Sequence, residues 1–280
     1  MRDDEIQALS TGGLLDRALE ITRRDCDSEA DLRWACVSGL HQRPEAEVFD
    51  AASAWCASGD PKERTLGADI LGQLGHLPPT FESPFADRSG PILLGLLEDP
   101  EPAVVESAVV ALGHLANAGA EWDSARLLPL ASNPDPEIRQ AVAFALGGAR
   151  SDDSNVAVEI MISLSRDPDI DVRSWATFGL GVLSDAGGAE VHEALWSRVD
   201  DPDHEVRGEA LVGLARRSDP RALGAIREEF DRDTVGILAV EAAAELGSPE
   251  LLPALESLLE EWPEEGSKIR DAIGCCRAGS

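Results

Sequence analysis

The segment DPDIDVRSWATFGLG at residues 167–181 decides the fold because it recurs at a fixed spacing. It returns 34 residues earlier as NPDPEIRQAVAFALG (133–147) and 34 residues later as DPDHEVRGEALVGLA (201–215). Each copy has Asp or Asn before Pro, an Arg six residues after that Asp or Asn, and a Leu seven residues after the Arg. Self-similarity at a fixed period indicates a solenoid, in which each repeat buries its apolar face against its neighbours.

Weaker copies extend the pattern over nearly the whole chain. Their Arg position holds Arg33, Arg64, Val105 or Ala239, and a degraded last copy begins at Ile269. A longer step between two of the copies indicates an insertion, which we place in an irregular loop at 76–90 because this stretch has three prolines and no apolar periodicity. The sequence therefore predicts one solenoid domain over 1–280, with repeats at about 12–43, 44–76, 90–117, 124–150, 154–184, 188–217, 220–247 and 250–280.

Each repeat is expected to be a pair of helices. Asp followed by Pro favours a helix start, since Asp caps free N–H groups and Pro at the first position has none to satisfy. Apolar residues then recur at three- and four-residue spacing along the second helix. Strand signals are scarce and Tyr is absent, so the predicted class is all-α: a right-handed α-solenoid, or superhelix, of about eight helix pairs. The expected first helices include 91–98, 125–132, 156–166, 190–199, 222–230 and 251–260.

The repeated phrase resembles the short HEAT-like repeat, found in many bacterial HEAT-repeat proteins and in phycobilin lyases. The Asp-Pro, Val-Arg and Leu-Gly elements carry this resemblance, and the patterns of tetratricopeptide and ankyrin repeats are missing. The resemblance implies that the Asp before the turn and the Arg six residues later form a ladder between neighbouring repeats. It gives a structural role to Asp167, Asp201, Arg139, Arg173 and Arg207.

The chain is strongly acidic, with 53 acidic and 24 basic residues and a formal net charge of −29. Such a field repels phosphate backbones, so we expect no nucleic-acid partner. The charge can serve to attract a basic protein, or it can be a compositional bias of the genome or of a salt-adapted proteome. The N-terminus lacks an apolar signal core, the longest charge-free stretch is too short to cross a membrane, and the five cysteines have no paired metal spacing. We therefore expect a cytoplasmic monomer without a membrane partner.

Catalytic signals are few, and we expect no catalytic residue, cofactor or metal. The pairs His192-Glu193 and His204-Glu205 are typical of HEAT-repeat metal hydroxylases, where they recur at one helical position in different repeats. Here they lie 12 residues apart and out of phase with the 34-residue repeat. No nucleophile motif or glycine-rich phosphate loop is present.

The face of the second helices that points away from the first helices is the better candidate for a site. With the Arg position as zero, positions +1, +4, +5 and +8 are expected on this concave face. Position +5 carries an apolar series where a solvated face would be polar. This series is either an open groove for a peptide or helix, or buried packing in a tightly curved solenoid. The candidate partner-binding residues are Val110, Phe144, Phe178, Val212, Trp175, Leu211, Glu106 and Glu209.

Three classes of function follow from these observations. The first is a non-catalytic interaction scaffold that binds a basic or amphipathic protein or peptide, with an acidic immunity or antitoxin protein as a narrower version. The second, implied by the resemblance, is a bilin lyase or chromophore-attachment chaperone. The third is the His-Glu metal hydroxylase. The tryptophans outside the concave face are expected in the core or at helix caps: Trp34, Trp55, Trp122, Trp196 and Trp262.

Overall fold

The computed structural model describes residues 6, 8–24, 29–78, 83–147, 155–183 and 187–278. Over these residues the backbone forms helices joined by turns and contains no β-strand. The chain divides into two compact units, Met1–Asp152 (unit 1) and Asp153–Ser280 (unit 2). The all-α class predicted from the 34-residue period is confirmed.

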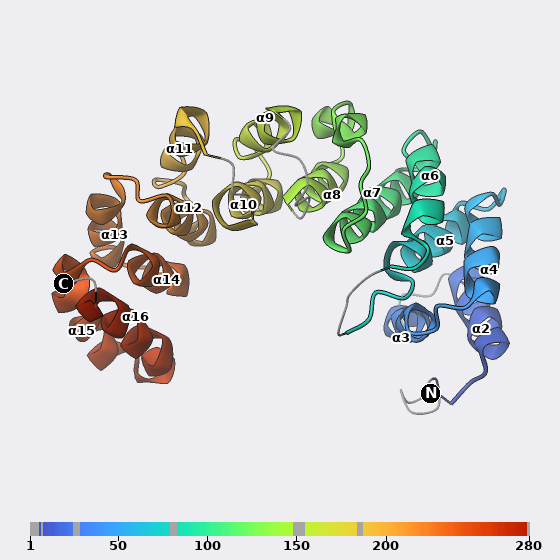
Figure 1. The fold of residues 1–280 in the computed structure, drawn as a ribbon, viewed down its shortest axis with the longest axis horizontal. Helices are drawn as coiled ribbons and strands as arrows, with labels where there is room; N and C mark the ends of the chain where they lie inside the picture. The colour runs from blue at the N-terminus through green and yellow to red at the C-terminus, as the bar shows by residue number, and fades with distance from the viewer. Residues whose placement is uncertain are drawn as a thin grey trace. The chain divides into compact units, whose positions relative to one another are not determined.

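Unit 1 stacks helix pairs so that the helices carrying the Arg position form one layer (Figure 1). In this layer α5 packs against both α3 and α7, and α7 packs against α8. The first helices form a second layer, in which α4 contacts α2 and α6. The second helices are α3 (Ala30–His41), α5 (Pro61–Gln73), α7 (Pro102–Asn117) and α8 (Pro136–Gly147), and the first helices are α2 (Thr11–Arg24), α4 (Ala46–Cys56) and α6 (Ala86–Leu96).

Unit 2 has the same two-layer construction, with α12 packed between α10 and α14, and α14 against α16 (Figure 1). The second helices are α10 (Ile170–Phe178), which the π-helical turn η4 (Gly179–Leu183) continues, α12 (His204–Arg216), α14 (Ile237–Leu246) and α16 (Gly266–Ala278). The first helices are α9 (Asn155–Leu164), α11 (Ala189–Trp196), α13 (Ala222–Phe230) and α15 (Leu252–Glu261), and the short turns η5 (Pro249–Leu251) and η6 (Pro263–Glu265) flank α15.

The core lies between the two layers and is built from the apolar positions that recur in the second helices. In α10 and η4 the side chains of Val172, Ala176 and Leu180 are almost completely buried. Burying one large aliphatic side chain contributes roughly 1.5–3 kcal/mol, so the repeated apolar stripe supplies the main stabilisation of each stack. The three- and four-residue spacing in the sequence has the same origin, because it keeps these residues on one face of the helix.

The Asp-Pro phrase starts helices in a different way from the one predicted. In the copy at 167 the N-cap is Asp169, whose side chain accepts from the backbone N–H groups of Asp171 and Val172. Asp167 precedes the helix by a turn and accepts from the N–H of Asp169 at 2.9 Å. The copy at 201 repeats this arrangement with Asp203 as the cap. The prediction placed the cap two residues early because both Asp167 and Asp169 have a short side chain that can accept a hydrogen bond from a nearby backbone N–H group. The side chain of Asp167 forms an Asx turn, and only that of Asp169 caps the helix.

Two predicted first-helix segments also need correction, and proline explains the first. The expected helix 125–132 is replaced by two 3-10 turns, η2 (Ser124–Leu127) and η3 (Leu130–Ser132). Pro129 has no N–H to donate to Ala125 four residues back, and its ring opposes a continuous α-helix at that point.

The second correction concerns the predicted loop at 76–90, of which residues 79–82 lie outside the described part. Helix α6 already begins at Ala86 and carries Pro91 inside it instead of at its start. The ring of Phe85 stacks on Phe49 at 5.0 Å, and the Arg88 guanidinium lies 3.9 Å from the Phe49 ring centroid. Packing against α4 thus extends the helix backward past a proline that the sequence marks as a boundary.

Candidate functional site

The Arg positions connect neighbouring repeats within each unit. Arg173 donates from Nε and Nη2 to the Asp201 carboxylate at 3.1 and 3.2 Å, and from Nη1 to the carbonyl of Asp167 at 2.9 Å. Arg64 makes the same bidentate contact with Asp99, donating from Nε at 2.7 Å and from Nη2 at 2.8 Å to its carboxylate. The guanidinium groups of Arg64 and Arg173 are hydrogen-bonded to carboxylates and carbonyl oxygens of the turns between repeats, so they do not present a free anion-binding surface.

Arg207 departs from the predicted Asp–Arg ladder. Its carboxylate partner is Glu229 of α13, at 2.8 and 2.9 Å, and both side chains are buried. Arg139 donates to the carbonyl oxygen of Asn133 at 2.8 Å, which joins its helix to the turn before it. Arg139, Arg173 and Arg207 therefore share a hydrogen bond to the carbonyl oxygen six residues earlier, while the carboxylate that pairs with the guanidinium differs between repeats.

Position +4 of the second helices does not face solvent as expected. All four residues there are buried to 1% exposure or less: Val109, Ala143, Thr177 and Leu211. Buried packing was one of the two alternatives for this face, and position +4 follows it. Within each unit the second helices of adjacent repeats pack against one another as well, so that a second helix also has neighbours on its flanks.

The remaining surface of the second helices is a narrower stripe at positions −2, +1, +2 and +5. These positions fall within about 100° of one another at 3.6 residues per turn. At +5, Val110, Phe144 and Phe178 are partly exposed, whereas Val212 is buried to 6%. Position +5 is therefore partly open in three of these repeats and packed in the fourth.

In unit 1 the partly exposed members of this stripe lie beside ionisable groups. Phe144 packs edge-on against His114, with ring centroids 5.1 Å apart. Glu106 is half-buried, and burial, followed by Glu137, Asp135 and Asp69, raises the pKa of its carboxyl group.

In unit 2 the stripe contains a pocket of about 320 Å³ between α10 and α12. The rings of Trp175 and Phe178 meet edge to face, with centroids 5.9 Å apart. The pocket joins these two aromatic residues with Glu209, and all three are candidate partner-binding residues of the sequence analysis. It is also lined by Asp171, Ser174 and Glu205. Asp171 and Glu205 were missed as site residues because position −2 was left out of the predicted face.

Glu209 is the most perturbed group of this pocket. Burial, followed by repulsion from Glu241 and Glu205, raises the pKa of its carboxyl group to about 7. Its Oε2 atom is buried and has no hydrogen-bond partner. A buried acceptor without a partner costs free energy, so this oxygen favours binding of a donor or a cation.

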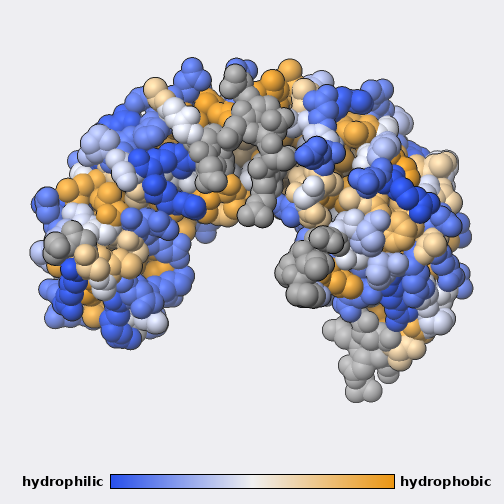
Figure 2. Space-filling view, viewed as in Figure 1, coloured by the Kyte–Doolittle hydropathy of each residue, from blue (hydrophilic) through white to orange (hydrophobic). Residues whose placement is uncertain are grey.

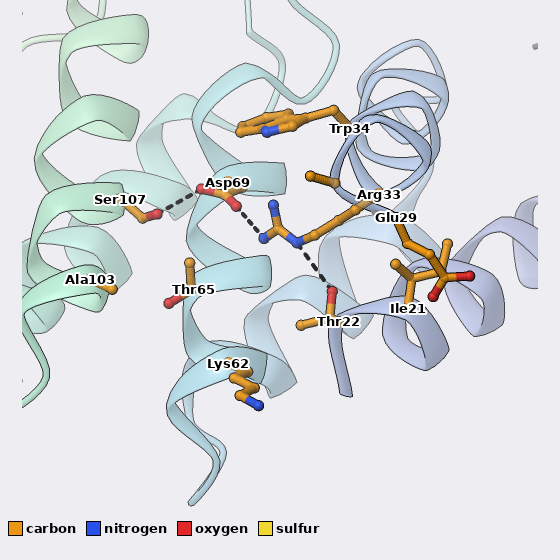
Figure 3. A pocket seen from close by; sticks show the side chains of 11 residues that line it. Ile21, Thr22, Glu29, Arg33, Trp34, Lys62, Thr65, Asp69, Ala103 and Ser107 are labelled. Atoms are coloured by element: carbon orange, nitrogen blue, oxygen red, sulfur yellow. Dashed lines mark hydrogen bonds and ion pairs between the residues drawn. The ribbon is translucent and has the colours of Figure 1, made fainter. Parts of the chain in front are cut away.

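Unit 1 contains a pocket of about 360 Å³ between α3, α5 and α7 (Figure 3). Arg33 extends across it and donates to Asp69 on one side and to Thr22, at 3.2 Å, on the other. The Ser107 hydroxyl donates to the second Asp69 oxygen at 2.7 Å. Trp34 is 49% exposed at the pocket edge, with the Arg33 guanidinium 5.5 Å from its ring centroid, so the prediction that Trp34 is a core or cap residue is wrong.

The two pockets share five positions of the repeat, and in unit 1 residues of the preceding repeat, Arg33 and Trp34 among them, complete the lining. Each is lined by −2, +1 and +5 of one repeat and by −2 and +2 of the next. The repeat thus builds a recurring hollow, and the residues at these positions set its chemistry. They are Lys62, Thr65, Asp69, Ala103 and Ser107 in unit 1, and Asp171, Ser174, Phe178, Glu205 and Glu209 in unit 2.

The pair His192-Glu193 joins α11 to the turn before α13 in unit 2. His192 Nδ1 lies 2.7 Å from an Asp219 oxygen, and Glu193 is paired with Arg221 at 2.6 Å. Arg221, followed by His192, holds the pKa of Asp219 well below its usual range. His204 is exposed at the start of α12. Among the residues that the structure describes, no group of three or more His, Cys, Asp or Glu side chains is placed to hold a metal ion.

The visible face of unit 2 is mixed in character. Figure 2 shows hydrophilic residues over much of its visible face, with smaller hydrophobic patches between them. None of the described helices combines the length and the apolar run that crossing a bilayer requires.

Comparison with known proteins places the repeats in a family. The family model for HEAT repeats matches residues 157–238, and the model for a single HEAT repeat matches 90–118. No curated protein matches the sequence. The solved structure of YibA from Escherichia coli is similar over 98% of this chain and 95% of its own, with 24% identity and a TM-score of 0.73.

Two further solved structures are more distant. An archaeal HEAT-like repeats protein from Thermococcus onnurineus NA1 covers 95% of this chain and 98% of its own, with 15% identity and a TM-score of 0.53. The CpcE–CpcF complex of phycocyanin lyase from Nostoc sp. PCC7120 covers 95% of this chain and 94% of its own, with 18% identity and a TM-score of 0.47, a likeness too loose to support a shared activity. The period, the stacked helix pairs and the matched models agree: residues 90–118 and 157–238 match HEAT-repeat models, and the described chain folds as stacked HEAT-type helix pairs.

Proposed function

We propose that this chain is a non-catalytic interaction protein that binds a basic or amphipathic segment of a protein partner. The binding surface is the stripe at positions −2, +1, +2 and +5 of the second helices. In unit 2 it is centred on Trp175 and Phe178. HEAT-type solenoids expose extended layers of parallel helices, and such surfaces suit elongated protein segments.

The observation that carries this proposal is the composition of the unit 2 pocket. It combines the edge of a Trp–Phe pair with three carboxylates, Asp171, Glu205 and Glu209. Aromatic side chains dominate the energetics of protein interfaces, and a polar rim around an apolar centre is their usual anatomy. The volume of about 320 Å³ suits one or two side chains of a partner and is small for a large cofactor.

Charge complementarity selects the class of partner. The chain carries a formal net charge of −29, and all three ionisable residues that line the unit 2 pocket are acidic. A negative field of this size accelerates encounters with basic proteins and repels acidic ones. A segment with Lys or Arg beside large apolar residues matches both the field and the aromatic centre.

Selection of peptides against the full chain tests the proposal. A displayed library of random dodecapeptides should enrich sequences that combine Lys or Arg with large apolar residues. Trp175→Ala should weaken the binding of the selected peptides roughly tenfold or more, as expected for an aromatic hot spot. The measurement is a fluorescence-anisotropy titration at low and moderate salt, with weaker binding at higher salt.

Leu183→Ala is the matched control, because Leu183 is a large exposed side chain of unit 2 outside the pocket. Phe178→Ser is a second pocket variant, and circular dichroism shows whether each variant keeps its helical content. Equal weakening by Leu183→Ala and Trp175→Ala would contradict the assigned surface. Enrichment of acidic peptides, or of none, would contradict the proposed partner class.

A further inference from the structure

The two pockets built by the repeat differ in whether the chain itself supplies a cation. In the unit 1 pocket the Arg33 guanidinium lies next to the indole of Trp34 and donates to the Asp69 carboxylate. The unit 2 pocket also joins an indole and carboxylates, but none of its six lining residues is Lys or Arg. Unit 1 thus shows, within the same protein, a guanidinium held beside an indole and a carboxylate in a pocket of similar build, although Arg33 and Trp34 come from the preceding repeat and Asp69 stands where unit 2 has Phe178.

The unit 2 pocket has the groups that such a cation requires. Trp175 and Phe178 provide aromatic surface, which attracts a cation through the negative face of the ring. Glu209 provides a buried carboxylate oxygen without a hydrogen-bond partner. A charged donor placed there would satisfy this oxygen and neutralise part of the repulsion between Glu209 and Glu205.

We infer that the unit 2 pocket is a socket for a single cationic side chain, the Lys or Arg of a bound protein segment, with Glu209 as its direct contact. The inference rests on the proposed function, since it names the residue of the partner that the interaction surface recognises. Trp175 and Phe178 pack against the apolar stem and the charged head of that side chain. Asp171 and Glu205 line the pocket and add negative charge around it.

The socket couples binding to proton release. Two ionisable groups act on Glu209: Glu241 from α14 and Glu205 from its own helix. Asp171 of α10 lines the same pocket from the other helix. Glu241 is itself paired with Lys268 at 3.2 Å. Among the described residues α11, α13 and η4, which also pack on α12, add no group to this set. The empty pocket holds the carboxyl partly protonated near neutral pH, and a cation favours the carboxylate.

Affinity for a cation must therefore rise with pH. With a pKa of about 7 for Glu209 in the empty socket, binding at pH 6 requires loss of a proton that is already absent at pH 8. The expected gain in affinity is roughly tenfold between these two pH values. The affinity should level off above that range, because Lys and Arg keep their charge there.

The test uses Nα-acetyl-arginine methylamide as the probe and Nα-acetyl-citrulline methylamide as its uncharged match of nearly the same shape. Binding to the full chain is followed by the indole N–H signal of Trp175 in nuclear magnetic resonance spectra, assigned with Trp175→Phe. The arginine probe should shift this signal saturably and the citrulline probe should not. Glu209→Gln should weaken the arginine probe about tenfold and abolish the rise between pH 6 and 8.

Glu228→Gln removes the same charge from an exposed position on α13 and is the matched control. It should leave both the affinity and its pH dependence unchanged. Equal shifts with the two probes, or a pH dependence that survives in Glu209→Gln, would overturn the socket. The probe is a single amino-acid derivative, so it can bind even if the peptide selection enriches no sequence. Saturable binding of the arginine probe together with a failed peptide selection would overturn the proposed function alone. If the selected peptides bound the wild type and the Glu209→Gln variant with equal affinity, the socket would be overturned and the proposed function would stand.

Discussion

At the scale of single residues, the buried ion pair Arg207–Glu229 is the contact whose loss should cost most. The two side chains are 7% and 2% exposed, and two hydrogen bonds of 2.8 and 2.9 Å join them. Neither charge is stable in such surroundings without the other, since water cannot replace the missing partner. Arg277 and Glu256 form a comparable pair at 2.9 Å, but both side chains are more than half exposed.

Arg207→Ala should lower the free energy of unfolding by about 3–5 kcal/mol, because it leaves Glu229 buried without its main partner. Arg277→Ala should change it by less than about 1 kcal/mol. Urea unfolding followed by circular dichroism measures both values. A similar small change in the two variants would show that Arg232, which lies 2.9 Å from Glu229, satisfies the carboxylate alone.

At the scale of the helix, the spacing between second helices is set by small residues. A methyl group at Gly72 of α5 would lie 2.7 Å from the Cα of Ala111 of α7. The two backbones are therefore in direct contact, and no flexible side chain is there to move aside. Gly224 of α13 has no atom within 4 Å of the corresponding position.

Substituting Ala for these two glycines should have opposite effects. Gly72→Ala should destabilise the fold by roughly 1–3 kcal/mol, because α5 and α7 must separate. Gly224→Ala should stabilise it by about 0.5–1 kcal/mol, because Ala loses less backbone entropy in a helix. Thermal unfolding of both variants gives the signs. A stabilised Gly72→Ala variant would contradict the direct backbone contact.

At the scale of the whole molecule, His114 of unit 1 and Glu209 of unit 2 should contribute to the pH dependence of stability with opposite signs. In unit 1, burial, followed by the charges of His41 and His76, lowers the pKa of His114 to about 4 from 6.5. Since the folded state binds this proton less well, the contribution of His114 to stability is lost as the pH falls from about 6.5 toward 4. In unit 2 the pKa of Glu209 is raised to about 7 from 4.5, so protonation of Glu209 adds stability as the pH falls from about 7 toward 4.5.

Urea unfolding of the full chain at pH 7.5 and 5.5 tests these signs. The loss of stability on acidification should be smaller in His114→Gln than in the wild type. It should be larger in Glu209→Gln, because this variant lacks the compensating gain. Identical changes in all three proteins would show that neither group titrates differently on folding.

Much of the architecture could be predicted from the sequence because it depends on local periodicity. The apolar spacing around Val172, Ala176 and Leu180 places these residues on one face of a helix, and the 34-residue period stacks such faces. Failures occurred where tertiary contacts override a local signal. Stacking of Phe85 on Phe49 carries α6 past Pro91, and the flanking helices bury Leu211 on a face that was expected to be open.

The candidate site was predicted only in part. Trp175, Phe178 and Glu209 were grouped because they share a helix face or its counterpart in the next repeat, and the pocket brings them together. Which residues at these positions stay open depends on the distance between neighbouring helices, which no single-helix pattern contains. For the same reason Val212 is buried although Phe178, one repeat earlier, is partly exposed.

By itself the sequence determined that the chain is an all-α stack of HEAT-type helix pairs with an acidic surface, since periodicity, capping residues and charge are properties of the local sequence. Only the tertiary structure decided what occupies the recurring hollow between repeats. In unit 1 it is the chain's own Arg33, held by Asp69. In unit 2 the hollow leaves Glu209 with a buried oxygen that has no partner. The physical reason is that desolvation and the pairing of charges arise only when residues far apart in the sequence are packed together.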